Sequence, residues 1–263
     1  PKILENKIVG NVAQKLFEEA NEMLEHLEMN KIIQTKAVVG FWQCDQIEEN
    51  NIVVYKNNKI QTTFNFLRQQ KPQGLDRPNR CLSDLIAPKH SNKRDVIGAF
   101  AVTAGLGVEE ACKEYEKKND DYSSILIKAL ADRLAEALAE YMHEKVRKEL
   151  WGYSKTELFS KEELIKEKYL GIRPAPGYPA CPDHSENVKL FKLLEAENRA
   201  GISLTENFGM LPAASISGWY FSHPESKYFG VGKIGEDQLK LISKNRKENI
   251  TITKKLLSTN LEK

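Results

Sequence analysis

The feature that most constrains this fold is a stretch from Tyr122 to Leu150 that contains neither glycine nor proline. It is rich in Ala, Leu, Glu and Lys, which favour helix, and Gly152 follows as a residue suited to end one. At 1.5 Å per residue, such a helix is roughly 40 Å long, enough to cross a whole domain. The sequence therefore predicts that the other elements pack along one long helix.

This predicted helix has an apolar stripe and a separate row of carboxylates. Asp132, Glu136 and Glu140 repeat every four residues, so they share one face. Such a row is either a solvated surface or the acidic lining of a site for a cationic ligand group, and the spacing leaves both open. The stripe expected to face the core comprises Ile127, Leu130, Leu134, Leu138 and Tyr141.

The rest of the chain mixes helical and alternating apolar patterns. A chain of 263 residues with 41% hydrophobic content can bury a substantial core. Helices interleaved with hairpins favour an α+β domain with a mostly antiparallel sheet, followed by a polar, peripheral tail after Arg246. The expected helices are Val12–Leu27, Phe64–Gln70, Glu162–Lys168, Asn187–Arg199 and Glu236–Asn245. The expected strands are Ala37–Trp42, Ile52–Tyr55, Asp95–Val102, Ala214–Ser222 and Lys227–Ile234.

Composition argues against several classes of protein. The net charge is +2 with acids and bases interspersed, which is not the basic face of a nucleic-acid binder. No apolar run approaches the roughly 20 residues that cross a bilayer, and no secretory signal opens the chain. The four cysteines are scattered and are expected to be reduced cytoplasmic thiols. Because the chain begins at Pro1 without methionine, we expect it to be a piece of a longer protein.

A proline-rich segment from Gly171 to His184 is the strongest candidate for a binding loop. It has four prolines in fourteen residues, which fix φ and remove backbone donors, so a surplus of carbonyl acceptors is expected. Arg173 and Tyr178 are then presented from a stiff frame that loses little entropy when a ligand binds. A carboxylate and an amino-bearing heterocycle would suit such a loop. The alternative is a connector between two helices.

Two other patterns superficially indicate chemistry. Thr103-Ala104-Gly105-Leu106-Gly107 follows a predicted strand, but it lacks the third glycine of a dinucleotide fingerprint. Cys181 and His184 could ligate a metal, but no second pair lies near them, and zinc sites need three or four ligands. The sequence shows no nucleophile–base signature, so no catalytic residue and no metal ligand is predicted.

The chain resembles a known family along almost its whole length. The run Arg173-Pro174-Ala175-Pro176-Gly177-Tyr178 resembles the Arg-x-x-x-Gly-Tyr signature of the activation domain of cobalamin-dependent methionine synthase. Residues 129–137 (ALADRLAEA) look like the long helix of that family, and residues 217–224 (SGWYFSHP) with 226–228 look like its hairpin. Residues 97–103 also fit.

The resemblance implies one C-shaped α+β domain over residues 1–263, with a twisted, mostly antiparallel sheet and helices around it. In that family the domain binds S-adenosylmethionine and presents its methyl group to inactive cob(II)alamin, which restores methylcobalamin. The cobalamin-binding domain of the same polypeptide is the implied partner, and flavodoxin or a flavoprotein reductase is the implied electron donor. Cobalamin and zinc would belong to other domains, and this piece would have no turnover alone.

The resemblance also implies which residues bind the ligand. Arg173 is the expected partner of its carboxylate, and the backbone around Ala175 and Gly177 is expected at the adenine edge. Acidic side chains would face the ammonium and sulfonium groups, and His184 would lie behind the site or on a docking surface. The full predicted set is Arg173, Ala175, Gly177, Tyr178, Tyr228, Phe229, Glu136, Asp132, Glu167 and His184.

One departure and one alternative remain. Family members have a further segment, with an acidic residue that contacts the ligand, ahead of the point matching Pro1, so weaker binding or an incomplete pocket rim is expected here.

The alternative is a self-contained Rossmann-type methyltransferase that uses Gly105 and Gly107 as its cofactor loop. That enzyme needs a parallel sheet and a Gly-rich turn at the ligand, whereas the activation domain needs Arg173 there.

Overall fold

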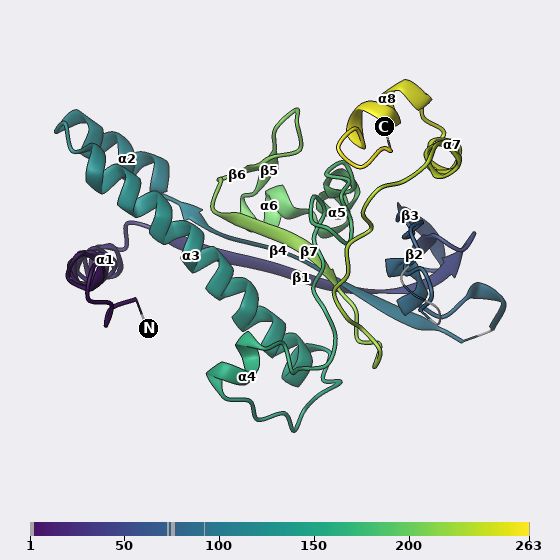
Figure 1. The fold of residues 1–263 in the computed structure, drawn as a ribbon, viewed down its shortest axis with the longest axis horizontal. Coiled ribbons are helices and arrows are strands. Elements are labelled where there is room, and N and C mark those ends of the chain that lie inside the picture. The colour runs from purple at the N-terminus through teal and green to yellow at the C-terminus, as the bar shows by residue number, and fades with distance from the viewer. Residues whose placement is uncertain (1–2, 73, 75–76, 92, 263) are drawn as a thin grey trace.

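A computed structural model describes residues 3–72, 74, 77–91 and 93–262. Its main sheet has five strands in the order β3-β2-β1-β4-β7, and every neighbouring pair is antiparallel. The predicted α+β class with an antiparallel sheet and surrounding helices is confirmed (Figure 1). The strands are β1 (Gln34–Ile47), β2 (Asn51–Lys56), β3 (Lys59–Asn65), β4 (Asp95–Leu106), β7 (Ser215–Tyr220), and the short pair β5 (Ser203–Leu204) and β6 (Met210–Leu211). The helices are α1 (Gly10–Met29), α2 (Val108–Lys117), α3 (Asp121–Lys145), α4 (Lys161–Ile165), α5 (Glu186–Leu194), α6 (Ala196–Ala200), α7 (Glu236–Arg246) and α8 (Ile250–Leu256), with short turns η1 (Leu82–Leu85), η2 (Lys89–Ser91) and η3 (Val146–Leu150).

The long helix is present, but of the predicted stripe only Ile127 is fully buried. α3 and the π-helical turn η3 together cover the whole predicted range. The side chains of Leu130, Leu134 and Leu138 are only half-buried, and Tyr141 is exposed. The buried face is instead mostly small, because alanines let α3 approach β4 and α2 closely. Its buried residues are Ser124, Ile127, Ala131, Ala135, Ala139 and His143.

The sheet is covered on both faces. Phe100 and Val102 of β4 pack toward α3, whereas Ala99 and Ala101 alternate with them and face the cluster that includes α5 and α6. This explains the continuous apolar run of β4, which is buried on both sides. In Figure 1, α3 crosses the sheet on one side, at an angle to the long strands β1 and β4.

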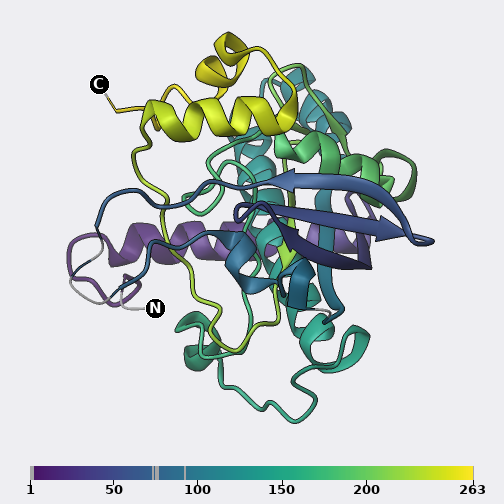
Figure 2. The same cartoon turned by 90° about the vertical axis from the view of Figure 1, so that its right-hand side faces the viewer.

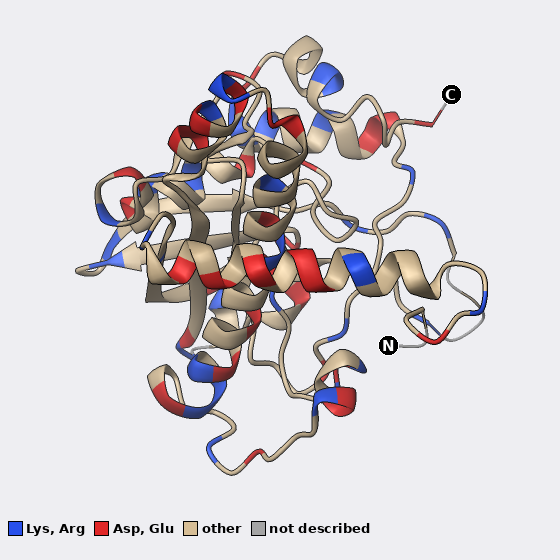
Figure 3. Cartoon of the chain, turned by 90° about the vertical axis from the view of Figure 1, so that its left-hand side faces the viewer, with Lys and Arg blue, Asp and Glu red and all other residues tan. Residues whose placement is uncertain are grey.

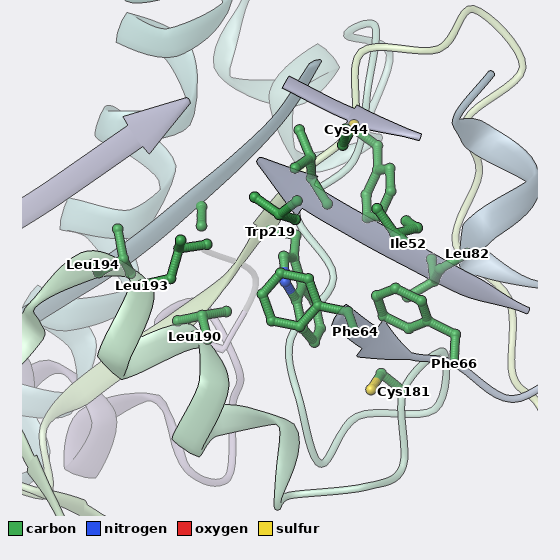
Figure 4. Packing of buried hydrophobic residues seen from close by; sticks show 14 of the residues in the cluster. Cys44, Ile52, Phe64, Phe66, Leu82, Cys181, Leu190, Leu193, Leu194 and Trp219 are labelled. Atoms are coloured by element: carbon green, nitrogen blue, oxygen red, sulfur yellow. The ribbon is translucent and has the colours of Figure 1, made fainter. Parts of the chain in front are cut away.

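The second face holds a dense aromatic core. Trp219 of β7 meets Phe64 and Phe66 edge-on, with ring centroids 5.2 and 5.1 Å apart (Figure 4). The predicted helix Asn187–Arg199 is present as α5 and α6, but Glu195 between them has φ +54 and breaks it. Of its apolar residues, Leu190, Phe191 and Leu194 are buried, whereas Val188 is exposed.

Two predicted elements are wrong. Phe64–Gln70 is not helical, because Phe64 pairs with Ile52 in the β2–β3 hairpin and Phe66 then donates its N–H to Asn50 O at 3.0 Å. The predicted strand Lys227–Ile234 is an extended segment outside the sheet that is held at several points. Val231 donates to Pro179 O at 2.8 Å, and Ile234 forms an isolated bridge with Leu261. In both cases long-range hydrogen bonds hold the segment in a conformation that the local pattern does not indicate.

The Gly-rich turn does not belong to a Rossmann sheet. β4 is antiparallel to both of its neighbours, so the alternative of a Rossmann-type methyltransferase is wrong. Gly105 packs against Pro212, whose side chain would lie 2.4 Å from an added Cβ. Gly107 has φ +91 and approaches Ile32 O, so packing explains both glycines.

The C-terminal region packs against the domain. α7 matches the predicted helix Glu236–Asn245, and α8 follows it (Figure 2). Leu257 is fully buried in a cluster with Leu239 and Ile242, so part of the tail predicted to be peripheral contributes to the core. α4 ends at Ile165, earlier than predicted, and Glu167 has a left-handed φ of +52.

The surface carries both basic and acidic side chains. On the side shown in Figure 3, basic and acidic residues are interspersed, and the second half of α1 carries a row of glutamates. The four cysteines lie apart as buried free thiols. Within the described ranges, no helix has the length and apolar character needed to span a membrane.

Candidate functional site

A cavity of about 440 Å³ lies between β4, α3, the proline-rich loop and the segment before α7. We call it the Arg173 cavity. Its wall is mostly apolar, with Arg173 and Glu136 as its two charged residues among those described. Few polar groups in an apolar cavity are typical of a small-molecule site. The lining residues are Phe100, Glu136, Arg173, Pro174, Ala175, Tyr178, Pro179, Ala180, Ile216, Tyr228 and Phe229.

The Arg173 side chain is held in place by three groups behind the cavity. Its Nη2 is 2.8 Å from Glu140 Oε2, and its Nη1 contacts Tyr169 Oη at 3.3 Å and His143 Nδ1 at 3.4 Å. Burial by itself lowers the pKa of Arg173, but Glu140, with Tyr228 and Tyr169, raises it above its ordinary value. The guanidinium therefore stays charged although its side chain is only 18% exposed.

These contacts leave part of the guanidinium available. An arginine has five N–H donors, and the contacts with described residues use Nη1 twice and Nη2 once. The Nε–H and one Nη2–H remain, which together can bind one carboxylate through two hydrogen bonds. Arg173 can therefore keep its partner Glu140 and still bind an acidic ligand group.

The loop around Gly177 is a tight turn closed by its own backbone. Gly177 donates to Cys181 O at 2.7 Å, and Cys181 donates to Tyr178 O at 2.9 Å. Gly177 has φ +88, and the His184 ring lies where a Cβ would be, with Cε1 only 2.1 Å away. A side chain at position 177 would have to displace that ring and adopt a strained backbone.

The prolines make the loop rigid, but the carbonyl oxygens of Pro174 and Pro179 are not free to accept hydrogen bonds from a ligand. Pro174 O accepts the N–H of Trp219 at 3.0 Å, and Ile172 exchanges two hydrogen bonds with Phe221. Pro179 O accepts the N–H of Val231. The expected surplus of free carbonyls is therefore wrong for Pro174 and Pro179, because the fold itself uses them to attach the loop to β7 and to the segment before α7.

Aromatic side chains form the wall and mouth of the Arg173 cavity. Phe100 stacks on Tyr220 at 4.7 Å with an interplanar angle of 23°. The Oη atom of Tyr228 accepts the backbone N–H of Arg173 at 3.0 Å. Tyr178 is 58% exposed and lies at the mouth. These rings offer flat faces for a heterocycle.

The acidic row of α3 is divided between two cavities. Glu136 lines the Arg173 cavity, and Glu140 holds Arg173 from behind. Asp132 lies beside Lys113 and Lys128 in a second cavity of about 450 Å³ against α2, which we call the α2 cavity. The α2 cavity is lined by Gly105, Val108, Glu109, Cys112, Lys113, Glu116, Lys128, Ala131, Asp132, Leu211, Pro212, Ala213 and Ala214.

The structure thus brings together most of the predicted site residues. Arg173, Ala175, Tyr178, Tyr228, Phe229 and Glu136 line one cavity, and Gly177 shapes its loop. Asp132, Glu167 and His184 are not among the lining residues. Glu167 is exposed, and His184 covers Gly177 from the other side.

Sequence reasoning missed three partners of Arg173. Glu140 belonged to the predicted carboxylate row, but its pairing with Arg173 needs the tertiary structure. His143 follows it by three residues on the same helix, so helical spacing could have indicated it. Tyr169, four residues before Arg173, gave no periodic signal. Among the described residues, no three His, Cys, Asp or Glu side chains gather as a metal site requires.

Comparison with known proteins identifies the family. The model of the family described as "Vitamin B12 dependent methionine synthase, activation domain" matches residues 1–247. The chain is also similar to a solved structure, the crystal structure of the MetH reactivation domain bound to AdoHcy, with a TM-score of 0.96 and 47% sequence identity. That match covers 100% of this chain and 81% of the other. The resemblance seen in the sequence is confirmed, and this chain belongs to the activation-domain family of vitamin B12-dependent methionine synthases.

Proposed function

We propose that this chain binds S-adenosylmethionine in the Arg173 cavity and presents its methyl group for the reductive remethylation of cob(II)alamin. The similar MetH reactivation domain was crystallised with AdoHcy, the demethylated form of the same ligand, which supports this choice. The cobalamin-binding domain of the same polypeptide would be the partner. A flavodoxin or flavoprotein reductase would supply the electron, in the cytoplasm.

The observation that carries the proposal is the partly satisfied guanidinium of Arg173. Its Nε–H and one Nη2–H are left by the contacts with described residues, in a cavity whose wall is mostly apolar. A carboxylate bound there gains charge-assisted hydrogen bonds with little competition from water. This matches the carboxylate of the amino-acid end of the ligand.

Other lining groups fit the remaining parts of the ligand. Tyr178, Tyr228 and Phe229 provide aromatic faces for the adenine, and the backbone at Ala175, which also lines the cavity, would face the adenine edge. Glu136 is the carboxylate of the lining that would face the ammonium and sulfonium groups. Asp132 lines the other cavity, so we assign it no contact with this ligand.

The ligand supplies the methyl group, and the residues of the chain bind and orient it. Gly177 and the flanking prolines keep the loop rigid, so little loop entropy is lost on binding. Glu167 and His184 would act indirectly, through Tyr228 and Gly177. The isolated chain is then a binding module without turnover of its own.

Titration calorimetry with S-adenosylmethionine tests the proposal. We expect Arg173→Ala to weaken binding by about 1.5–3 kcal/mol, because a charged hydrogen-bond partner is lost. Arg173→Lys should recover only part of this, since an ammonium cannot form the two-pronged contact. Lys113→Ala in the α2 cavity is the matched control and should bind as wild type.

Gly105→Ala is a poor control, because its new methyl would contact Pro212 and disturb the fold. If folded Arg173→Ala binds as tightly as wild type, the assignment of Arg173 is wrong. If Lys113→Ala loses binding while Arg173→Ala does not, the ligand occupies the α2 cavity.

A further inference from the structure

His143 is a fully buried residue of α3 that faces Arg173 from behind the cavity. Its ring stacks on Tyr220 with centroids 5.3 Å apart and an angle of 16°. Tyr169 meets the ring edge-on at 5.0 Å. Tyr220 in turn stacks on Phe100, which lines the cavity. A continuous series of packed rings therefore connects His143 with the cavity wall.

The contact between His143 and Arg173 favours one tautomer of the imidazole. His143 Nδ1 lies 3.4 Å from Nη1 of Arg173, and a guanidinium can only donate. A hydrogen bond across this contact requires an unprotonated Nδ1, and the neutral ring then carries its proton on Nε2. His143 Nε2 has no hydrogen-bond partner among the described residues.

The surroundings of His143 keep it neutral. Burial lowers the pKa of His143 well below its ordinary value, and the charges of Arg147 and Arg173 lower it further. Arg147 is itself fixed by Glu157 at 2.8 Å and lies over the Tyr169 ring at 4.2 Å. Glu140 approaches Arg173 from the same helix, one turn earlier. A protonated His143 would be a third cation between Arg147 and Arg173, so these two charges favour the neutral imidazole, which can accept a hydrogen bond.

We propose that His143 is a positioning residue that fixes the plane of the Arg173 guanidinium by accepting a hydrogen bond at Nδ1. With Nη1 bound to His143 and Tyr169 and Nη2 bound to Glu140, the guanidinium has one preferred orientation. Its remaining Nε and Nη2 donors are then ready for the ligand before it arrives, which avoids an ordering cost on binding. The ligand role of this inference rests on the proposed function.

Three variants of the chain test the effect on binding. His143→Phe keeps an aromatic ring in the stack but removes the acceptor, and it should bind S-adenosylmethionine about tenfold more weakly, which corresponds to about 1.4 kcal/mol. His143→Asn places an amide oxygen near the position of Nδ1 and should recover most of that loss. His90→Phe, an exposed histidine outside the cavity lining, is the matched control and should bind as wild type.

A spectroscopic readout tests the positioning without any ligand. The ¹⁵N chemical shifts of the His143 ring in the wild-type chain should show an unprotonated Nδ1 and a protonated Nε2. In Arg173→Ala the Nδ1 shift should move, because its donor is gone, while the ring stays buried against Tyr220. A merely structural packing role of His143 would leave that shift unchanged.

These readouts separate the inference from the function on which it rests. If the wild-type chain does not bind S-adenosylmethionine, the proposed function fails, and the ¹⁵N measurement still decides whether His143 accepts from Arg173. A protonated Nδ1 in the wild type overturns the inference. So does a folded His143→Phe chain with wild-type affinity. If His143→Phe does not fold, failure of folded His143→Asn to bind near wild-type strength overturns it instead.

Discussion

The Arg173 cavity and the α2 cavity have nearly the same volume, about 440 and 450 Å³, and both lie against α3. They differ in how their charges are held. Arg173 is 18% exposed and has three side-chain partners behind the cavity wall. In the α2 cavity, Lys113 and Lys128 are 61% and 57% exposed and pair with exposed glutamates.

This difference shows that volume alone does not identify a binding site. Exposed ion pairs are screened by water and reorganise at little cost, so they orient a ligand poorly. A buried guanidinium with fixed partners keeps its direction and attracts a carboxylate more strongly. We therefore expect substitutions around the Arg173 cavity to have larger effects than matched ones around the α2 cavity.

The largest contrast is expected between buried and exposed ion pairs. Arg147 and Glu157 behind the Arg173 cavity are 0% and 4% exposed. Glu157→Ala leaves Arg147 charged and unpaired in the interior and should lower the free energy of unfolding by about 3–5 kcal/mol. Lys113→Ala breaks an exposed pair of the α2 cavity and should change it by less than about 1 kcal/mol. Urea denaturation compares the two, and equal losses would remove the distinction.

A smaller effect is expected from two glycines with similar backbone. Gly177 and Gly232 have φ of +88 and +74, so Gly177→Ala and Gly232→Ala should each cost about 1–2 kcal/mol of stability. No described atom lies within 4 Å of a Cβ at Gly232, whereas His184 occupies that space at Gly177. We expect only Gly177→Ala to weaken binding of S-adenosylmethionine in calorimetry. Equal affinities for both folded variants would show that the Gly177 turn does not shape the site.

The smallest predicted effect is a difference in ligand binding between substitutions of Glu136 and Asp132, two carboxylates of the same row on α3. Glu136→Gln should weaken binding of S-adenosylmethionine about twofold to fivefold, because a partly solvated carboxylate near a cation contributes up to about 1 kcal/mol. The effect should shrink with added salt and be weaker for AdoHcy, which lacks the sulfonium charge. Asp132→Asn, in the α2 cavity, should change neither affinity. A loss for Asp132→Asn equal to that for Glu136→Gln would contradict the separation of the cavities.

Much of this molecule could be predicted from local patterns. α1 and α7 follow from helical patterning, the β1–β2 hairpin and the buried strand β4 follow from short apolar runs, and α3 follows from the absence of glycine and proline. The predictions for Lys227–Ile234 and Phe64–Gln70 were wrong because long-range hydrogen bonds, among them those of Val231, Ile234 and Phe66, override a weak local preference. Local patterns contain no information on such partners.

The sequence by itself determined the stiff loop with its cationic residue, because proline and glycine restrict or permit backbone angles whatever surrounds them. Only the tertiary structure decided which carboxylate reaches Arg173. Asp132 and Glu140 share a helical face, but eight residues separate them by about 12 Å along α3, so they meet different neighbours. Glu140 pairs with Arg173, and Asp132 lies in the α2 cavity. Which face of α3 is buried was likewise settled by the close approach of β4, which small alanines allow.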